Sequence, residues 1–209
     1  MIEKIKLISQ SAIRIEDNKI IYFDPFKLTN EYNNDADIIF ITHSHYDHYS
    51  KEDILKIKKE TTKIVVPEEL YKTVLDLGFK EIITVKPNNE YIVDEYRFKT
   101  VPAYNINKDY HKKEYNWVGY IISINSKVLY IAGDTDNIPE INNIVCDYAF
   151  VPVGGTYTMN YIEAAELIKT IKPLVAIPIH YKTVVGSTKD AYDFKKELNG
   201  LVDVKILME

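Results

Sequence analysis

Three histidines and an aspartate lie within six consecutive positions, directly after the apolar run 38–41: His43, His45, Asp47 and His48. Side chains two residues apart in an extended chain point to the same side, so His43 and His45 face one way. Asp47 and His48 are adjacent and converge only if the backbone turns there. Neutral imidazole and carboxylate are the ligands that zinc, iron and manganese share. The cluster therefore predicts a metal site.

Further candidate groups follow other apolar segments: the Tyr104-Asn105 corner, Gly133-Asp134, Gly154-Gly155 and His180. In open α/β sheets, ligands collect in the crevice beyond the carboxyl ends of the strands. Four of the five histidines lie at such strand ends, and the fifth, His111, lies in the loop after one. This distribution is typical of a metal site and has no reason to arise among surface histidines.

The elements that position these groups alternate between strands and helices. We expect strands over residues 3–8, 12–16, 19–23, 36–42, 63–66, 81–85, 96–101, 117–124, 127–132, 148–153, 174–179 and 202–207. We expect helices over 51–59, 68–77, 160–171 and 189–198. Ser50 with Asp53 and Asn160 with Glu163 are the spacings of helix-capping signals, and Asn125-Ser126 predicts a hairpin turn. Strands come first and then alternate with helices, an order that suits sheets covered by helices on their outer faces. Composition and periodicity alone predict a mixed α and β protein.

Composition limits the class of protein. The chain has 209 residues, is 46% hydrophobic and carries a net charge of -5, which suits a single domain over residues 1–209. No apolar run approaches the roughly 18 residues of a membrane span, so none is expected. Lysines are interleaved with acids, which disfavours a long nucleic acid as substrate. The single cysteine, Cys146, forms no internal disulfide and favours the cytoplasm.

The string His-x-His-x-Asp-His at 43–48 resembles the metal-binding signature of the metallo-β-lactamase-fold hydrolases. The resemblance extends from Asp24 to Tyr181 and implies a four-layer αββα sandwich of two mixed sheets. Together with Pro102–Asn105, Gly133–Asp136 and residues 152–159, the sequence looks like a bacterial and archaeal subgroup called only metal-dependent hydrolases. More distant relatives include a sugar-acid lactonase and an N-acyl phosphatidylethanolamine phosphodiesterase.

The resemblance implies a ligand set for two metals. His43 and His45 would hold the first metal, and Asp47, His48 and His180 the second, with Asp134 as the bridge. The family's third histidine for the first metal normally lies at the corner where this chain has Asn105. Either His111 reaches in from the loop, or the first site keeps two histidines and Asp134. We prefer His111, because the loop has no other evident reason to contain a histidine. The alternative is that His111 is a solvent-exposed loop residue.

Several neighbouring residues keep two interpretations each. Asp24 resembles a family aspartate that orients a metal ligand, or forms a turn before Pro25. Gly154 and Gly155 allow a close backbone approach or make a tight turn. Tyr157 and Tyr181 donate to a developing oxyanion or belong to the core. Asp136 supports a ligand or starts a helix before Pro139.

The function that follows is metal-dependent hydrolysis, in which a metal-bound hydroxide attacks a small phosphodiester, lactone or ester. Two divalent metals are expected, zinc first, with manganese or iron as alternatives, and Asp47 or Asp134 would move a proton. One alternative is a di-iron oxidoreductase that takes electrons from a separate protein. Another is a metal-binding protein without turnover. The sequence predicts no oligomeric state.

Overall fold

The strands fall into two mixed sheets, one of six strands and one of seven, in a computed structural model that describes residues 2–208. The chain divides into two units between Lys86 and Pro87, and each unit carries one of the sheets. The predicted fold class, mixed α/β with two mixed sheets, is confirmed. The single domain over residues 1–209 stays a prediction, and its two terminal residues lie outside the described part of the chain.

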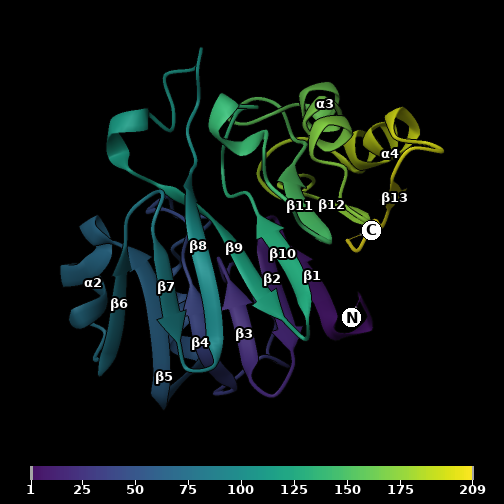
Figure 1. The fold of residues 1–209 in the computed structure, drawn as a ribbon. Coiled ribbons are helices and arrows are strands. Elements are labelled where there is room, and N and C mark those ends of the chain that lie inside the picture. Colours follow the sequence, from purple (N-terminus) through teal and green to yellow (C-terminus); the bar gives the residue numbers. More distant parts are fainter. Residues whose placement is uncertain (1, 209) are drawn as a thin grey trace. The chain divides into compact units, whose positions relative to one another are not determined.

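The first unit has the strand order β1-β2-β3-β4-β5-β6. Its strands are β1 (Ile5–Ser9), β2 (Ala12–Glu16), β3 (Ile20–Phe23), β4 (Ala36–Phe40), β5 (Lys58–Pro67) and β6 (Glu81–Val85). The pairs β1–β2 and β2–β3 are antiparallel, whereas β3 to β6 run parallel (Figure 1, purple to blue). Every residue of β4 except Asp37 is buried, so side chains on both faces of this parallel strand are shielded from water, which explains its almost entirely apolar sequence.

Local signals set most of the boundaries in this unit. Helix α1 (Lys51–Ile57) begins after Ser50, whose side chain accepts a hydrogen bond from the Asp53 N–H, as predicted. It ends two residues before the predicted end, because Lys58 already belongs to β5. The predicted helix over 68–77 is a 3-10 turn, η2 (Glu68–Leu70), followed by the short helix α2 (Tyr71–Leu75). Another 3-10 turn, η1 (Ile2–Lys4), replaces the start of the first predicted strand.

The second unit has the strand order β13-β12-β11-β10-β9-β8-β7. Its strands are β7 (Glu90–Val93), β8 (Tyr96–Pro102), β9 (Val118–Ile124), β10 (Lys127–Ile131), β11 (Tyr148–Pro152), β12 (Val175–Ile179) and β13 (Asp203–Val204). Strands β7 to β10 are antiparallel, and β10 to β13 run parallel. The predicted hairpin turn at Asn125-Ser126 has φ values of 51° and 57°, as a type I′ turn requires.

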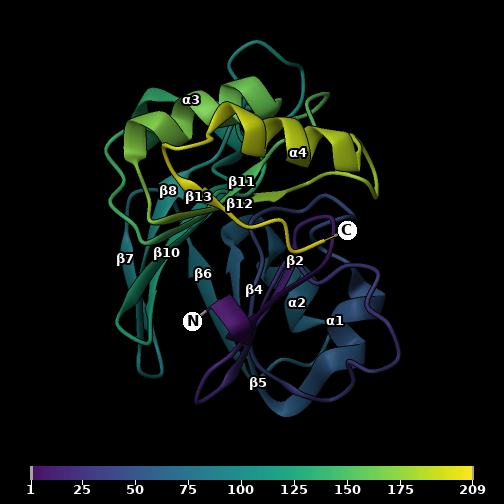
Figure 2. The same ribbon diagram turned by 90° about the vertical axis from the view of Figure 1, so that its right-hand side faces the viewer.

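Two helices of the second unit, α3 (Tyr161–Ile171) and α4 (Thr188–Glu197), lie side by side over β11 and β12 (Figure 2). Asn160 and Glu163 form the predicted capping box of α3. Its buried face consists of Ala164, Ala165, Leu167, Ile168 and Ile171. Two 3-10 turns, η3 (Lys113–Tyr115) and η4 (Pro139–Ile141), complete the unit.

The parallel strands of each sheet bring their carboxyl ends to one edge of that sheet. In the first unit, β3 and β4 lead into Asp24 and Thr42. In the second, β10, β11 and β12 lead into Asp134, Gly154 and His180. Strand order thus explains why chemistry-bearing residues far apart in the sequence gather within each unit. Between residues 2 and 208, the helices are too short or too polar for a membrane crossing.

Candidate metal centre

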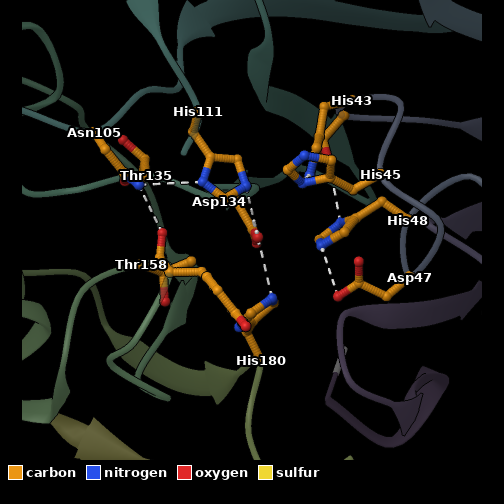
Figure 3. A network of polar contacts seen from close by, with 12 residues as sticks. His43, His45, Asp47, His48, Asn105, His111, Asp134, Thr135, Thr158 and His180 are labelled. Atoms are coloured by element: carbon orange, nitrogen blue, oxygen red, sulfur yellow. Dashed lines mark hydrogen bonds and ion pairs between the residues drawn. The ribbon is translucent and has the colours of Figure 1, made fainter. Parts of the chain in front are cut away.

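The ligand loop of the first unit follows β4 and turns back on itself. The N–H groups of His48 and Tyr49 both donate to the His45 carbonyl, at 3.0 and 2.7 Å. This turn lets the adjacent Asp47 and His48 reach the same region, as the sequence required. His43 Nε2 lies 3.1 Å from His45 Nδ1, and the side chains of His43, Asp47 and His48 are buried (Figure 3).

Asp24 fixes the orientation of His48. Its Oδ2 lies 2.7 Å from His48 Nδ1, and its two oxygens accept the Thr42 N–H at 2.8 Å and the Thr42 hydroxyl at 2.7 Å. The opposite ring nitrogen, His48 Nε2, then lies 3.7 Å from Asp47 Oδ2. Asp24 itself has a left-handed φ of 45°. Of the two interpretations from sequence, the structure supports the aspartate that orients a candidate ligand.

Gln10 contacts a candidate metal ligand, Asp47, and was not predicted from the sequence. It lies in the turn between β1 and β2, is fully buried, and donates from Nε2 to Asp47 Oδ2 at 3.2 Å. A glutamine in a tight turn is ordinarily a surface residue. Only its burial in the folded chain marks it as a partner of the ligand loop.

In the second unit, the Asp134 carboxylate lies between two histidines (Figure 3). Its Oδ2 is 3.1 Å from His111 Nε2 and 3.1 Å from His180 Nε2, and the three side chains are at most 3% exposed. Asp134 follows β10 and His180 follows β12, whereas His111 comes from the loop after β8. His111 is therefore not the solvent-exposed loop residue of the alternative interpretation.

Asn105 lies against the other side of the His111 ring. Its Nδ2 donates to the Tyr157 carbonyl at 2.7 Å and lies 3.2 Å from His111 Nδ1. Its backbone N–H donates to the His111 carbonyl at 2.8 Å. The asparagine at the corner after β8 thus supports the histidine that the loop supplies.

The donor set fits a divalent transition metal. Two ligands of a tetrahedral zinc, each 2.0–2.1 Å from the ion, lie roughly 3.3 Å apart. The His43–His45 contact and the two contacts of Asp134 are 3.1 Å long. Partners of the far ring nitrogens, such as Asp24 for His48, are what ligating histidines ordinarily have. The residues that offer ligand atoms are His43, His45, Asp47, His48, His111, Asp134 and His180.

Two tyrosines considered from the sequence have other contacts. The Tyr181 hydroxyl is buried and donates to the Met208 carbonyl at 2.5 Å, so this side chain holds the backbone at Met208. The Tyr157 ring meets the Tyr110 ring edge to face, with 4.7 Å between centroids.

The two glycines after β11 serve different purposes. A Cβ on Gly154 would lie 2.2 Å from the His180 carbonyl oxygen, so this glycine permits a close backbone approach beneath a candidate ligand. Gly155 has a φ of 81°, which makes it the turn residue.

Comparisons with known proteins identify the family of this chain. Residues 4–180 match the family model described as Beta-lactamase superfamily domain. A UPF0173 metal-dependent hydrolase from Pyrococcus abyssi is 32% identical over 219 residues, which cover 98% of this chain and 96% of that protein. The structure of Igni18, a metallo hydrolase from Ignicoccus hospitalis, aligns with a TM-score of 0.82 and 29% identity, covering 98% of this chain and 94% of that chain.

A more distant likeness concerns the fold alone. CmlA, a diiron β-hydroxylase from Streptomyces venezuelae, aligns with a TM-score of 0.76 and 14% identity, covering 97% of this chain and 52% of that chain.

The fold and the His/Asp clusters define a metal-dependent hydrolase of the metallo-β-lactamase type. The chain belongs to the beta-lactamase superfamily and, within it, to the UPF0173 metal-dependent hydrolases.

Proposed function

We propose that this protein hydrolyses a small phosphodiester, lactone or ester at a centre of two divalent metal ions, with zinc as the first candidate. The observation that carries the proposal is the position of one oxygen, Asp134 Oδ2, at 3.1 Å from both His111 Nε2 and His180 Nε2. A carboxylate that bridges two metals must approach a ligand of each. Asp134 meets this requirement if the two histidines serve different ions.

The proposed ligands are those that the family pattern implies. His43, His45 and His111 would hold the first metal, Asp47, His48 and His180 the second, and Asp134 both. Membership of the superfamily supports joining these residues into one centre, and the match over residues 4–180 supports one domain over residues 1–209. One cysteine, Cys146, and no internal disulfide suit a reducing compartment such as the cytoplasm.

When bound, two such metals supply an activated water near neutral pH and polarise the oxygen that gains charge. The chain's own residues orient the centre: Asp24 holds His48 and Asn105 holds His111. Asp47 and Asp134 are the buried carboxylates that we assign to moving a proton, and Gln10 holds Asp47 in place.

A covalent route through Cys146 is disfavoured, because burial raises the pKa of this thiol to about 12. A small substrate is favoured over a long nucleic acid by the net charge of -5 and the interleaved acids and lysines.

The test combines metal analysis with turnover. Purified protein should contain transition metal and should cleave bis-p-nitrophenyl phosphate or a member of a lactone panel, with activity lost on chelation and restored by zinc. Asp134→Asn should lower both metal content and rate, the rate by roughly 100-fold or more, since loss of an outer partner alone costs 10- to 100-fold. Asp147→Asn is the matched control, because Asp147 immediately precedes β11 and its carboxylate accepts the Val128 N–H at 2.8 Å.

Activity that survives chelation, or full metal content in Asp134→Asn, would overturn the proposal. An iron-loaded protein that reduces oxygen with an external electron donor and hydrolyses nothing would establish the oxidoreductase instead. Metal binding without either activity would identify a metal-binding protein.

A further inference from the structure

Asp136 lies two residues after Asp134, and its carboxylate holds the loop that leads to His111. Its Oδ2 accepts the Ile106 N–H at 2.9 Å, and its Oδ1 pairs with Lys108 Nζ. The Asp136 side chain is 10% exposed and that of Lys108 is 25% exposed. One nearly buried carboxylate thus holds a backbone group and a side chain of the same loop.

The contacts of Asp136 continue a backbone connection between the two segments. The Asp136 N–H donates to the Tyr104 carbonyl at 2.9 Å. The Thr135 hydroxyl donates to the same carbonyl at 3.1 Å and accepts the Tyr104 N–H at 3.2 Å. The start of the loop is therefore fixed to the segment that carries Asp134.

The rest of the loop needs such support. Residues 103–112 contain neither helix nor strand, and His111 has a left-handed φ of 53°. A non-glycine residue keeps this conformation only where its surroundings impose it. Beyond residue 106, the loop is held by the Asn105–His111 backbone bond of 2.8 Å, by the contact of the Tyr110 and Tyr157 rings, and by the Lys108 pair with Asp136.

Asp136 does not start a helix. The 3-10 turn η4 begins at Pro139, the residue before it is Ile138, and no side chain caps this turn. The Asp136 carboxylate is directed instead to Ile106 and Lys108, on the loop.

We propose that Asp136 is a positioning residue for the first metal, because it fixes the loop so that His111 Nε2 stays 3.1 Å from Asp134 Oδ2. The inference rests on the proposed function, in which both residues hold that metal. It predicts that the hydrogen bond to the Ile106 N–H is the essential contact and that the ion pair with Lys108 contributes less.

The experiment is a titration of the metal-free protein with Co²⁺, followed by the absorption of the bound ion. Asp136→Ala should bind the first metal 10- to 100-fold more weakly, with an altered cobalt spectrum, as loss of an outer partner does elsewhere. Asp136→Asn keeps an acceptor for the Ile106 N–H and should restore most of the affinity. Lys108→Met should cost only a few-fold.

Glu140→Ala is the matched control. Glu140 also joins the loop to the segment after β10, through Lys113 Nζ at 2.7 Å and the Tyr104 hydroxyl at 2.9 Å. These contacts involve only side chains, and the Lys113 side chain is 63% exposed. Removing Glu140 should therefore leave the affinity for Co²⁺ and the cobalt spectrum unchanged.

A second arm separates positioning from general destabilisation. If Asp136 acts through His111, Asp136→Ala should cause no further loss of affinity in a His111→Ala background. In the metal-free protein, amide hydrogen exchange over residues 104–111 should be faster in Asp136→Ala than in Glu140→Ala. If Asp136→Ala does not fold, Asp136→Ser, which shortens the side chain and removes its charge, carries the exchange measurement.

Unchanged first-metal affinity in Asp136→Ala, an equal loss with and without His111, or unchanged loop exchange would overturn the inference. Failure of the unmodified protein to bind any metal would instead overturn the proposed function. The exchange measurement needs no metal and still tests the contact between Asp136 and the loop.

Discussion

Replacing Gly154 with alanine tests whether close backbone packing positions His180. A Cβ on Gly154 would lie 2.2 Å from the His180 carbonyl oxygen and 2.9 Å from Val185 Cγ2, where Cβ contacts under 3.0 Å are essentially never seen. The His180 carbonyl would have to retreat by about 1 Å to reach ordinary van der Waals contact. A metal site tolerates only about 0.2 Å in its ligand distances, so this movement should remove His180 as a ligand.

The size of the effect follows from the same overlap. Inserting a methyl group into a packed site costs about 1–3 kcal/mol. For a chain of this length each kcal/mol lowers Tm by roughly 2–4 °C, so we expect a fall of about 2–12 °C. Elemental analysis should show close to one metal per chain in Gly154→Ala if the unmodified protein holds two, because the second metal loses a ligand.

Gly155→Ala is the control for loss of stability alone. Gly155 has a φ of 81°, and the nearest atom to an added Cβ is Asn160 Cβ at 3.7 Å, so alanine there is strained without touching His180. The strain is about 1–2 kcal/mol, comparable to the cost at Gly154. Gly155→Ala should therefore lose stability and keep its metals. Equal metal content in the two variants would refute the reasoning.

Two further changes follow from the contacts of single side chains. Asp24→Asn should weaken binding of the second metal 10- to 100-fold in a calorimetric titration, because His48 Nδ1 loses a charged partner at 2.7 Å. Asparagine still tolerates the left-handed φ of this position. Unchanged affinity would contradict the role of Asp24 in orienting His48. Burial raises the Cys146 thiol pKa from 9.0 to about 12, so at pH 8 the folded protein should react with iodoacetamide roughly 1,000-fold more slowly than the unfolded chain. The folded state holds this proton more tightly, so the stability that comes from the thiol should be complete below pH 9 and fall as the pH rises toward about 12. This fall should be less steep in Cys146→Ala. Equal labelling rates in the folded and unfolded states would argue against burial of the thiol.

The candidate ligands of the first unit could be predicted because their signals are local. His43 to His48 are close in sequence, and the apolar run before them predicts the strand that presents them. The capping box of Asn160 and Glu163 likewise gave the start of α3, and the Asn125-Ser126 turn gave the hairpin. Such features depend on hydrogen bonds within a few residues, which the residue types alone determine.

Strand β7 was not predicted from the sequence, because local signals do not mark it. Residues 90–93 form a run of only four residues after a turn, and Val93 alone among them is buried, so too little sequence is available to mark a strand. They form a strand because they pair with β8, where Glu90 faces Lys99 and Val93 faces Tyr96. An edge strand of this kind depends on its neighbour more than on its own composition.

The partners of the candidate ligands were decided only by the tertiary structure. Gln10 reaches Asp47 across 37 positions, and Gly154 meets the His180 backbone because β11 and β12 are parallel neighbours. The sequence left open whether His111 replaces the histidine that is missing at Asn105, whereas the folded loop places Asn105 against the far side of the His111 ring. Residue type and spacing limit which groups are available for chemistry. Which backbone segments lie beside them depends on strand order and on close packing of segments distant in sequence, and no local pattern encodes either.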